Sequence, residues 1–112
     1  MSDFVHPDPK DVPLAAALHA LADPARLSIL RRLDDGEELS CEAALPADEA
    51  PKSTRSNHFR ILRAAGLIET RKAGRVYLSR LRRSDVDRRF PGLLGSVLDI
   101  AASDDAELRK AG

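Results

Sequence analysis

The sequence predicts a mainly helical domain that carries a small β-hairpin in its second half. Apolar residues recur every three or four positions between residues 12 and 65 and again after residue 91, which is the period of amphipathic helices. From Leu67 to Arg80 the pattern instead shows β-branched and aromatic residues on both sides of Ala73-Gly74, which is typical of a hairpin. The length of 112 residues suits a single domain.

The first two predicted helices share the same start signal. Asp11 precedes Val12-Pro13 and Asp23 precedes Pro24, and an acidic cap before an early proline favours a helix start. We expect a first helix to end near Ala22 and a second to end near Asp35-Gly36. Their apolar stripes are Leu14, Ala17, Leu18 and Leu21 in the first, and Leu27, Leu30 and Leu33 in the second.

Two serines indicate where the next helices begin. Ser40 is a suitable N-cap for a short helix from Cys41 to Leu45, with Ala44 and Leu45 facing inward. Ser53 is the expected N-cap of a fourth helix, from Thr54 to Ala65, which packs through Phe59, Leu62 and Ala65 and stops at Gly66. An acidic connector, residues 46–51, joins the two helices and has a proline at each end.

After the hairpin, Ser84 is expected to cap a short helix through Arg89, and Phe90-Pro91-Gly92 breaks it. A last helix then runs to about Ala102. The order of four helices, two strands and one or two further helices is that of a winged helix-turn-helix. We expect one domain over residues 12–102, a flexible lead-in over residues 1–11 and a polar tail over residues 103–112.

A zero net charge hides a polarised molecule. Residues 51–83 contain ten Lys and Arg side chains against one acid, Glu69, so this stretch carries +9 and the rest of the chain −9. Such a split favours one basic face that meets phosphate. The alternative is accidental clustering on a solvated surface.

Several classes of protein are excluded. With Cys41 as its one cysteine the chain forms no internal disulfide, which favours a reducing compartment, and we expect a cytoplasmic location with no membrane segment or signal peptide. No nucleophile–base pair, carboxylate pair or phosphate-binding glycine loop points to an enzyme. Ser56, His58 and Asp85 form a triad by composition alone.

The fourth helix and the hairpin have the features of a DNA-reading unit. A helix fits the major groove, where Asn reads adenine and Arg reads guanine, and a wing can bring cations to nearby phosphates. Thr54, Ser56, Asn57 and Arg60 supply such donors on the helix. The wing tip supplies Arg71, Lys72 and Arg75.

Three blocks, residues 18–33, 53–70 and 74–81, resemble the ArsR/SmtB family of bacterial transcriptional regulators. The resemblance implies a homodimer that binds an imperfect inverted repeat in promoter DNA, as a repressor or an activator. It implies DNA contacts from the fourth helix, at Lys52, Ser53, Thr54, Arg55, Ser56, Asn57, His58 and Arg60. It also implies dimerisation through the helices at residues 12–22 and 91–102, where Leu14, Leu18, Leu21, Leu93, Leu94, Val97 and Leu98 are the candidates.

The sequence departs from the family at several positions. Arg55 occupies an inward position that is usually apolar, and the 46–51 connector replaces a tight turn. Ser40 and Glu42 stand where metal-sensing relatives have two thiolates, and no histidine follows His58, so we expect neither the usual metal sites nor a cofactor. We expect His58 to be a hydrogen-bonded scaffold residue near the backbone rather than a catalyst. The weak alternative is a metal held by His6 and His19 with Asp3, Asp8 and Asp11.

Two further hypotheses stay open at this point. In the first, the chain is a protein-interaction module that keeps the winged fold without reading DNA. In the second, its regulation depends on a separate sensor protein.

Overall fold

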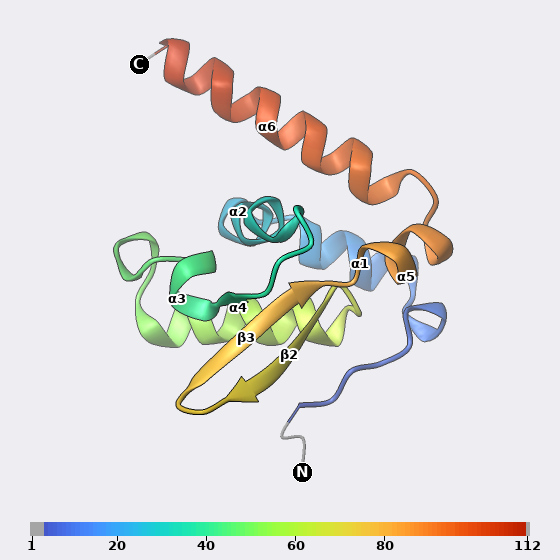
Figure 1. The fold of residues 1–112 in the computed structure, drawn as a ribbon. Helices are drawn as coiled ribbons and strands as arrows, with labels where there is room; N and C mark the ends of the chain where they lie inside the picture. Colours follow the sequence, from blue (N-terminus) through green and yellow to red (C-terminus); the bar gives the residue numbers. More distant parts are fainter. Residues whose placement is uncertain (1–3, 112) are drawn as a thin grey trace.

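The computed structural model describes residues 4–111 and the side chains of residues 4–107. Six α-helices and a three-stranded sheet make up this part of the chain, with a short 3-10 helix before the first α-helix and another between α3 and α4 (Figure 1). The elements are η1 Pro9–Asp11, α1 Leu14–Leu21, α2 Pro24–Leu33, β1 Leu39–Ser40, α3 Cys41–Ala44, η2 Ala47–Glu49, α4 Lys52–Ala64, β2 Ile68–Ala73, β3 Val76–Leu81, α5 Arg83–Arg89 and α6 Leu93–Ala111.

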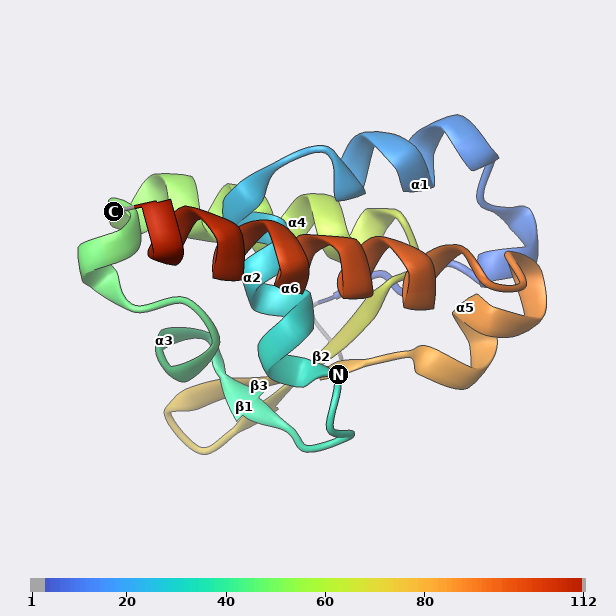
Figure 2. The same cartoon turned by 90° about the horizontal axis from the view of Figure 1, so that it is seen from above.

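Helix α2 is the centre of the fold. It contacts α1, α3, α4, α6 and β3, and its Ile29, Leu30 and Leu33 are fully buried. Phe59 and Leu62 of α4 join the same core, as the sequence predicted. Helix α6 crosses the outer side of α2 in both views (Figures 1 and 2). Burial of this one apolar cluster fixes the orientation of α4 relative to the rest of the domain.

The predicted hairpin is confirmed, and the sheet has one strand more than expected. Strands β2 and β3 pair antiparallel from Ile68 opposite Leu81 to Ala73 opposite Val76. Gly74 at the tip has a φ of 64°, a left-handed conformation that favours glycine. The third strand, β1, pairs with β3 through Leu39 and Ser40, so the wing is joined directly to the start of α3.

Two of the expected caps are confirmed. The Asp23 carboxylate accepts hydrogen bonds from the Ala25 and Arg26 amides, and the Ser40 hydroxyl accepts one from the Ala43 amide. Both side chains therefore satisfy amides that the first turn of a helix leaves unpaired.

Three expected helix starts are wrong. Helix α4 begins at Lys52 after Pro51, helix α5 begins at Arg83, and helix α1 begins at Leu14 after Pro13. Ser53 and Ser84 thus lie inside their helices, and Asp11 belongs to η1. Proline with extended backbone angles precedes α1 and α4, because its ring fits the position just before a helix as readily as the first turn.

Helix α6 continues to Ala111, past the expected end at Ala102. The apolar stripe ends near Ile100, so apolar spacing could not indicate that the helix continues beyond Ala102. An ion pair between Arg31 of α2 and Asp105 links the later turns of α6 to the domain.

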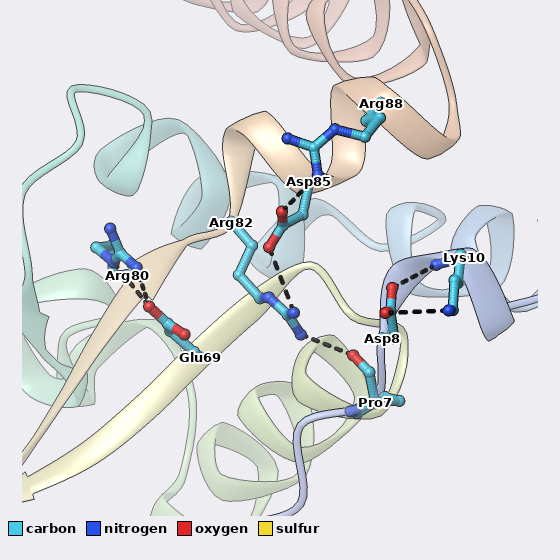
Figure 3. Close-up of polar contacts among 8 residues, drawn as sticks. All are labelled: Pro7, Asp8, Lys10, Glu69, Arg80, Arg82, Asp85 and Arg88. Carbon is cyan, nitrogen blue, oxygen red and sulfur yellow. Dashed lines mark hydrogen bonds and ion pairs between the residues drawn. The ribbon is translucent and has the colours of Figure 1, made fainter.

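Residues 4–8, here called the strap, pack against the wing, although the sequence predicted a flexible or extended lead-in. The Thr70 amide donates to His6 Nε2 over 3.0 Å. Arg82 donates to the Pro7 carbonyl over 2.7 Å, as Figure 3 shows. The ring of Phe4 meets the ring of Tyr77 edge-on at 5.3 Å. The strap therefore covers the outer edge of β2, which β3 leaves unpaired.

No helix among the described residues is long and apolar enough to cross a membrane.

Candidate nucleic-acid interface

One side of α4 is buried and the other is open. Phe59 and Leu62 face the core, as does His58, whose residue is 8% exposed. The opposite side carries six of the eight predicted contact residues of this helix, all of them exposed: Lys52, Ser53, Thr54, Ser56, Asn57 and Arg60. The helix thus presents a continuous polar face.

Within this face Arg60 donates a hydrogen bond to Asn57 Oδ1 over 2.5 Å. The bond joins the two side chains best suited to read base edges, since Arg pairs with guanine and Asn with adenine. Their positions three residues apart place them on the same side of the helix.

Arg55 has a structural role in the connector. Its Nε donates to the Ala50 carbonyl over 3.1 Å, and the side chain is half-buried. The unusual residue and the unusual connector are therefore linked, because Arg55 satisfies a carbonyl that the connector leaves open.

His58 belongs to a buried network rather than to the exposed face. Arg26 of α2 lies 3.2 Å from His58 Nδ1, and since a guanidinium can only donate, Nδ1 accepts. Arg26 also donates to the Ala20 carbonyl over 2.7 Å and to the His19 carbonyl over 3.0 Å. The expected scaffold role of His58 agrees with these contacts, and its expected DNA contact does not agree with its burial.

Arg26 itself was missed by sequence reasoning. It is 7% exposed, and it ties the end of α1 to α4. A signal was present, because Arg26 stands four residues before Leu30 and seven before Leu33, on the buried stripe of α2. A charged residue on such a stripe indicates a specific buried partner.

The three cations expected at the wing tip divide into one that is paired, Arg71, and two that are not, Lys72 and Arg75. Arg71 makes two hydrogen bonds to Glu38, of 2.7 and 2.9 Å, which raise the pKa of Arg71 and lower that of Glu38. Lys72 and Arg75 are exposed, and nothing in residues 4–107 pairs with either one. Below them, the buried hydroxyls of Thr70 and Ser79 share a hydrogen bond across the two strands.

Ion pairs narrow the basic surface that the sequence predicted. Arg80 pairs with Glu69, Arg82 with Asp85, and Arg83 with Asp34 and Asp87 (Figure 3 shows the first two). Of the cations in residues 51–83, those without an acidic partner in the described part of the chain lie along α4 and at the wing tip, where Lys52 and Arg75 border the same groove. The usable positive face is therefore smaller than the local charge of +9 suggested.

No metal or catalytic cluster forms from the candidate residues that the structure describes. No group of three or more His, Cys, Asp and Glu side chains in this part of the chain is arranged to hold a metal ion. The Ser40 hydroxyl caps α3, and His6 accepts from Thr70, while Asp3 lies outside the described residues. Burial raises the pKa of the Cys41 thiol.

The composition-only triad is not assembled. Asp85 pairs with Arg82 and Arg88 of α5, whereas His58 is bonded to Arg26.

The expected dimer residues divide into exposed and buried groups. Leu14 and Leu18 are 50% and 46% exposed, whereas Leu21 is buried in the protomer. On α6, Leu94 and Leu98 are buried, and Leu93 and Val97 are half-buried. Ile100, which is not among the expected dimer residues, is 62% exposed.

Known proteins are similar to this chain in sequence and in fold. A family model described as a helix-turn-helix domain matches residues 21–71. The chain is 41% identical over 84 residues to YceK of Bacillus subtilis (strain 168), an uncharacterized HTH-type transcriptional regulator, covering 74% of this chain and 84% of that protein. It is 35% identical over 80 residues to the HTH-type transcriptional repressor SmtB of Mycobacterium tuberculosis (strain CDC 1551 / Oshkosh), covering 70% of this chain and 58% of the repressor. The chain belongs to the ArsR/SmtB family of winged helix-turn-helix transcriptional regulators.

Solved structures of ArsR-type proteins have the same fold. A homodimeric winged helix-turn-helix DNA-binding domain of Mycobacterium bovis, a possible ArsR-family regulator, has a TM-score of 0.62 and 31% identity, covering 84% of this chain and 82% of that domain. The transcriptional repressor BigR from Xylella fastidiosa has a TM-score of 0.59 and 25% identity, covering 78% and 84%. The chain is thus an ArsR-type DNA-binding transcriptional regulator, and its family is one of regulators rather than enzymes.

Proposed function

We propose that this ArsR-type regulator acts as a homodimer in the cytoplasm, binds an inverted repeat in promoter DNA, and lacks the metal sites that many relatives use. The observation that carries the DNA part of the proposal is the open polar face of α4 beside the two unpaired wing cations, Lys72 and Arg75. A polar helix and a basic wing on one side of a domain suit a major groove and the neighbouring phosphates.

Two kinds of contact follow from the side chains. Asn57 and Arg60 read base edges, and Thr54 and Ser56 support them with hydroxyl donors. The phosphate contacts come from Lys52 at the start of α4 and from Lys72 and Arg75 of the wing. Ser53 also faces the DNA, and Arg71 reaches it when Glu38 releases it.

The homodimer brings two α4 helices to successive turns of the duplex. The α1 leucines Leu14 and Leu18 and the α6 residue Ile100 support it, because large apolar side chains this exposed are buried favourably against a second copy. Half-buried Leu93 and Val97 extend the same surface. The Mycobacterium bovis relative, which is described as homodimeric, supports the same arrangement.

The proposed lack of metal control rests on the residues that stand where metal-sensing relatives have thiolate ligands. Ser40 uses its hydroxyl to cap α3, and Glu42 is exposed beside it. One thiol, Cys41, is too few for a thiolate site.

The test is DNA selection followed by titration. Genomic fragments retained by the protein should share an inverted repeat, and binding to it should weaken steeply with salt. Arg75→Gln should weaken binding to all sequences alike and reduce the salt slope by about one unit. Arg60→Ala should cost about 1–3 kcal/mol and relax preference at one base pair. The matched control is Arg88→Gln, a change at an exposed α5 cation whose side chain is 78% accessible, and it should leave DNA affinity unchanged.

Two results would contradict the proposal. A charge-reversed Arg60→Glu, Arg75→Glu protein that binds the selected repeat as tightly as the parent would remove the proposed face. Failure to retain any genomic fragment, with tight capture of one defined protein, would favour an interaction module instead.

A further inference from the structure

A groove opens between α4 and the wing and is not explained by base or phosphate contacts alone. Its volume is about 550 Å³, and its walls come from Ser40 and the start of α3, from α4 as far as Arg63, from the β2–β3 wing and from the strap. This volume lies inside the range of about 300–1,000 Å³ that small-molecule sites occupy. The groove is thus large enough for a drug-sized compound.

The lining of the groove includes a large apolar part. Val76 and Tyr77 of the wing expose 48% and 40% of their surface, and both line the groove. Phe4 of the strap packs edge-on against Tyr77, and the half-buried Cys41 also lines the space. DNA backbone has no need of such a surface, whereas the body of an organic ligand does.

The same groove contains a cation that lacks an acceptor. Arg63 of α4 is half-buried, and its guanidinium lies 4.4 Å from the centre of the Phe4 ring. The Arg63 guanidinium also interacts electrostatically with the Cys41 thiol, and no carboxylate or carbonyl of residues 4–107 pairs with it. Burial lowers the pKa of Arg63, which expresses the cost of holding this charge with reduced hydration. An anion in the groove would offset that cost.

The surrounding charge favours an anion as well. Lys52, Arg55 and Arg75 also line the groove, and Glu42, which is exposed, is the one acid among the described residues that line it. Lys52 and Arg75 have no partner in residues 4–107, whereas Arg55 uses its Nε for the Ala50 carbonyl. The positive potential of these side chains attracts a negatively charged ligand.

We propose that the groove binds a small amphipathic carboxylate, with its carboxylate on Arg63 and its apolar ring or chain against Phe4, Val76 and Tyr77. Guanidinium and carboxylate match in shape and form paired hydrogen bonds. The effect on DNA rests on the proposed function: the ligand neutralises the surroundings of Lys52 and Arg75, and so lowers DNA affinity.

Binding is tested first without DNA. The probe is 1-naphthoate, and its binding to the full chain is measured by its own fluorescence and by calorimetry. The uncharged control is 1-naphthamide, which keeps the ring system. Inorganic phosphate is the second control, an anion that has no ring. We expect one naphthoate per chain. The amide should bind at least about tenfold more weakly, since it lacks the charge-assisted pair.

Two variants and a control locate the site. Arg63→Gln removes the proposed carboxylate partner, and Val76→Asp places a repelling carboxylate on an exposed wall, so each should weaken naphthoate binding at least about tenfold. Arg88→Gln removes an exposed cation of α5, outside the groove, and should leave binding unchanged. Circular dichroism establishes that each variant is folded, and Val76→Asp decides the matter if Arg63→Gln does not fold.

Several outcomes would overturn the proposal. The first is that naphthoate does not bind at concentrations up to about 1 mM, and the second is that the amide binds as tightly as naphthoate. The third is that phosphate displaces naphthoate at equal concentration. The fourth is that the folded variants bind naphthoate as tightly as wild type does. A second experiment measures DNA affinity with and without naphthoate. Wild type should lose affinity, whereas Arg63→Gln should bind DNA normally and ignore the probe. If the chain bound naphthoate but no DNA, the groove proposal would stand and the proposed function would fall.

Discussion

Replacing Arg26 with leucine tests whether the buried network holds the reading helix. One guanidinium serves three acceptors: the carbonyls of Ala20 and His19 at the end of α1, and Nδ1 of His58 in α4. Leucine keeps much of the apolar stem and has a helix propensity close to that of arginine. The change therefore removes the hydrogen bonds with little effect on the helix itself.

The expected cost is about 3 kcal/mol. The Ala20 carbonyl and His58 Nδ1 are buried and lose their donor, at about 1–3 kcal/mol each. The exposed His19 can take water in place of Arg26 and adds little. Part of the sum is offset because leucine is more easily buried than a guanidinium.

Urea unfolding at one fixed protein concentration measures the effect, since the stability of the proposed dimer would depend on concentration. The urea midpoint should fall by roughly 1–3 M. The matched control is Arg31→Leu on the same helix, whose half-exposed ion pair with Asp105 should be worth about 0–1 kcal/mol. A double-mutant cycle of Arg26→Leu with His58→Ala should give a coupling of about 1 kcal/mol. If Arg26→Leu cost no more than Arg31→Leu, the network would not be what positions α4.

Three further predictions concern the wing, the strap and the dimer. Gly74→Ala should cost about 1 kcal/mol in urea unfolding from its left-handed φ alone, because a Cβ there meets no atom within 4 Å; a loss several times larger would contradict this. Burial lowers the pKa of His6, and the cations Arg82 and Arg63 add to this effect while Glu69 opposes it, so the neutral ring is favoured in the folded protein. The strap's contribution to stability is therefore complete above the ordinary histidine pKa and is lost as pH falls below it. The protection factor of the Thr70 amide should therefore drop between about pH 7.5 and pH 5, and a drop of equal size in His6→Gln would refute the assignment. Leu18→Glu should convert the proposed dimer to a folded monomer in sedimentation experiments, and a dimer that persists in this variant would place the interface elsewhere.

Much of the architecture could be predicted from local signals. The Asp23 and Ser40 caps, the Gly74 turn and the apolar stripes of α2 and α4 act within a few residues of the chain, so their physics is legible in sequence. Strand β1 could not be found this way. Two residues have no periodicity, and the pairing of Leu39 with Ser79 is decided by contacts between distant parts of the chain.

The candidate interface shows the same division. The exposure of Asn57 and Arg60 followed from helical spacing, but the availability of each cation did not. Arg71 is paired with Glu38, thirty-three positions away, and Arg63 lies against Phe4. Such pairings depend on how the strap and the β1 connection fold over the wing, which no window of sequence contains.

The position of the strap has a practical consequence for anyone handling this protein. Because Phe4 rests on Tyr77 and borders the groove, any tag fused ahead of the strap emerges beside the face proposed to meet DNA. The far end of α6 lies on the opposite side of the domain from the strap (Figure 1). A purification handle placed after α6 keeps the binding face clear, whereas one placed before the strap would add its own charge and bulk to every affinity measured there.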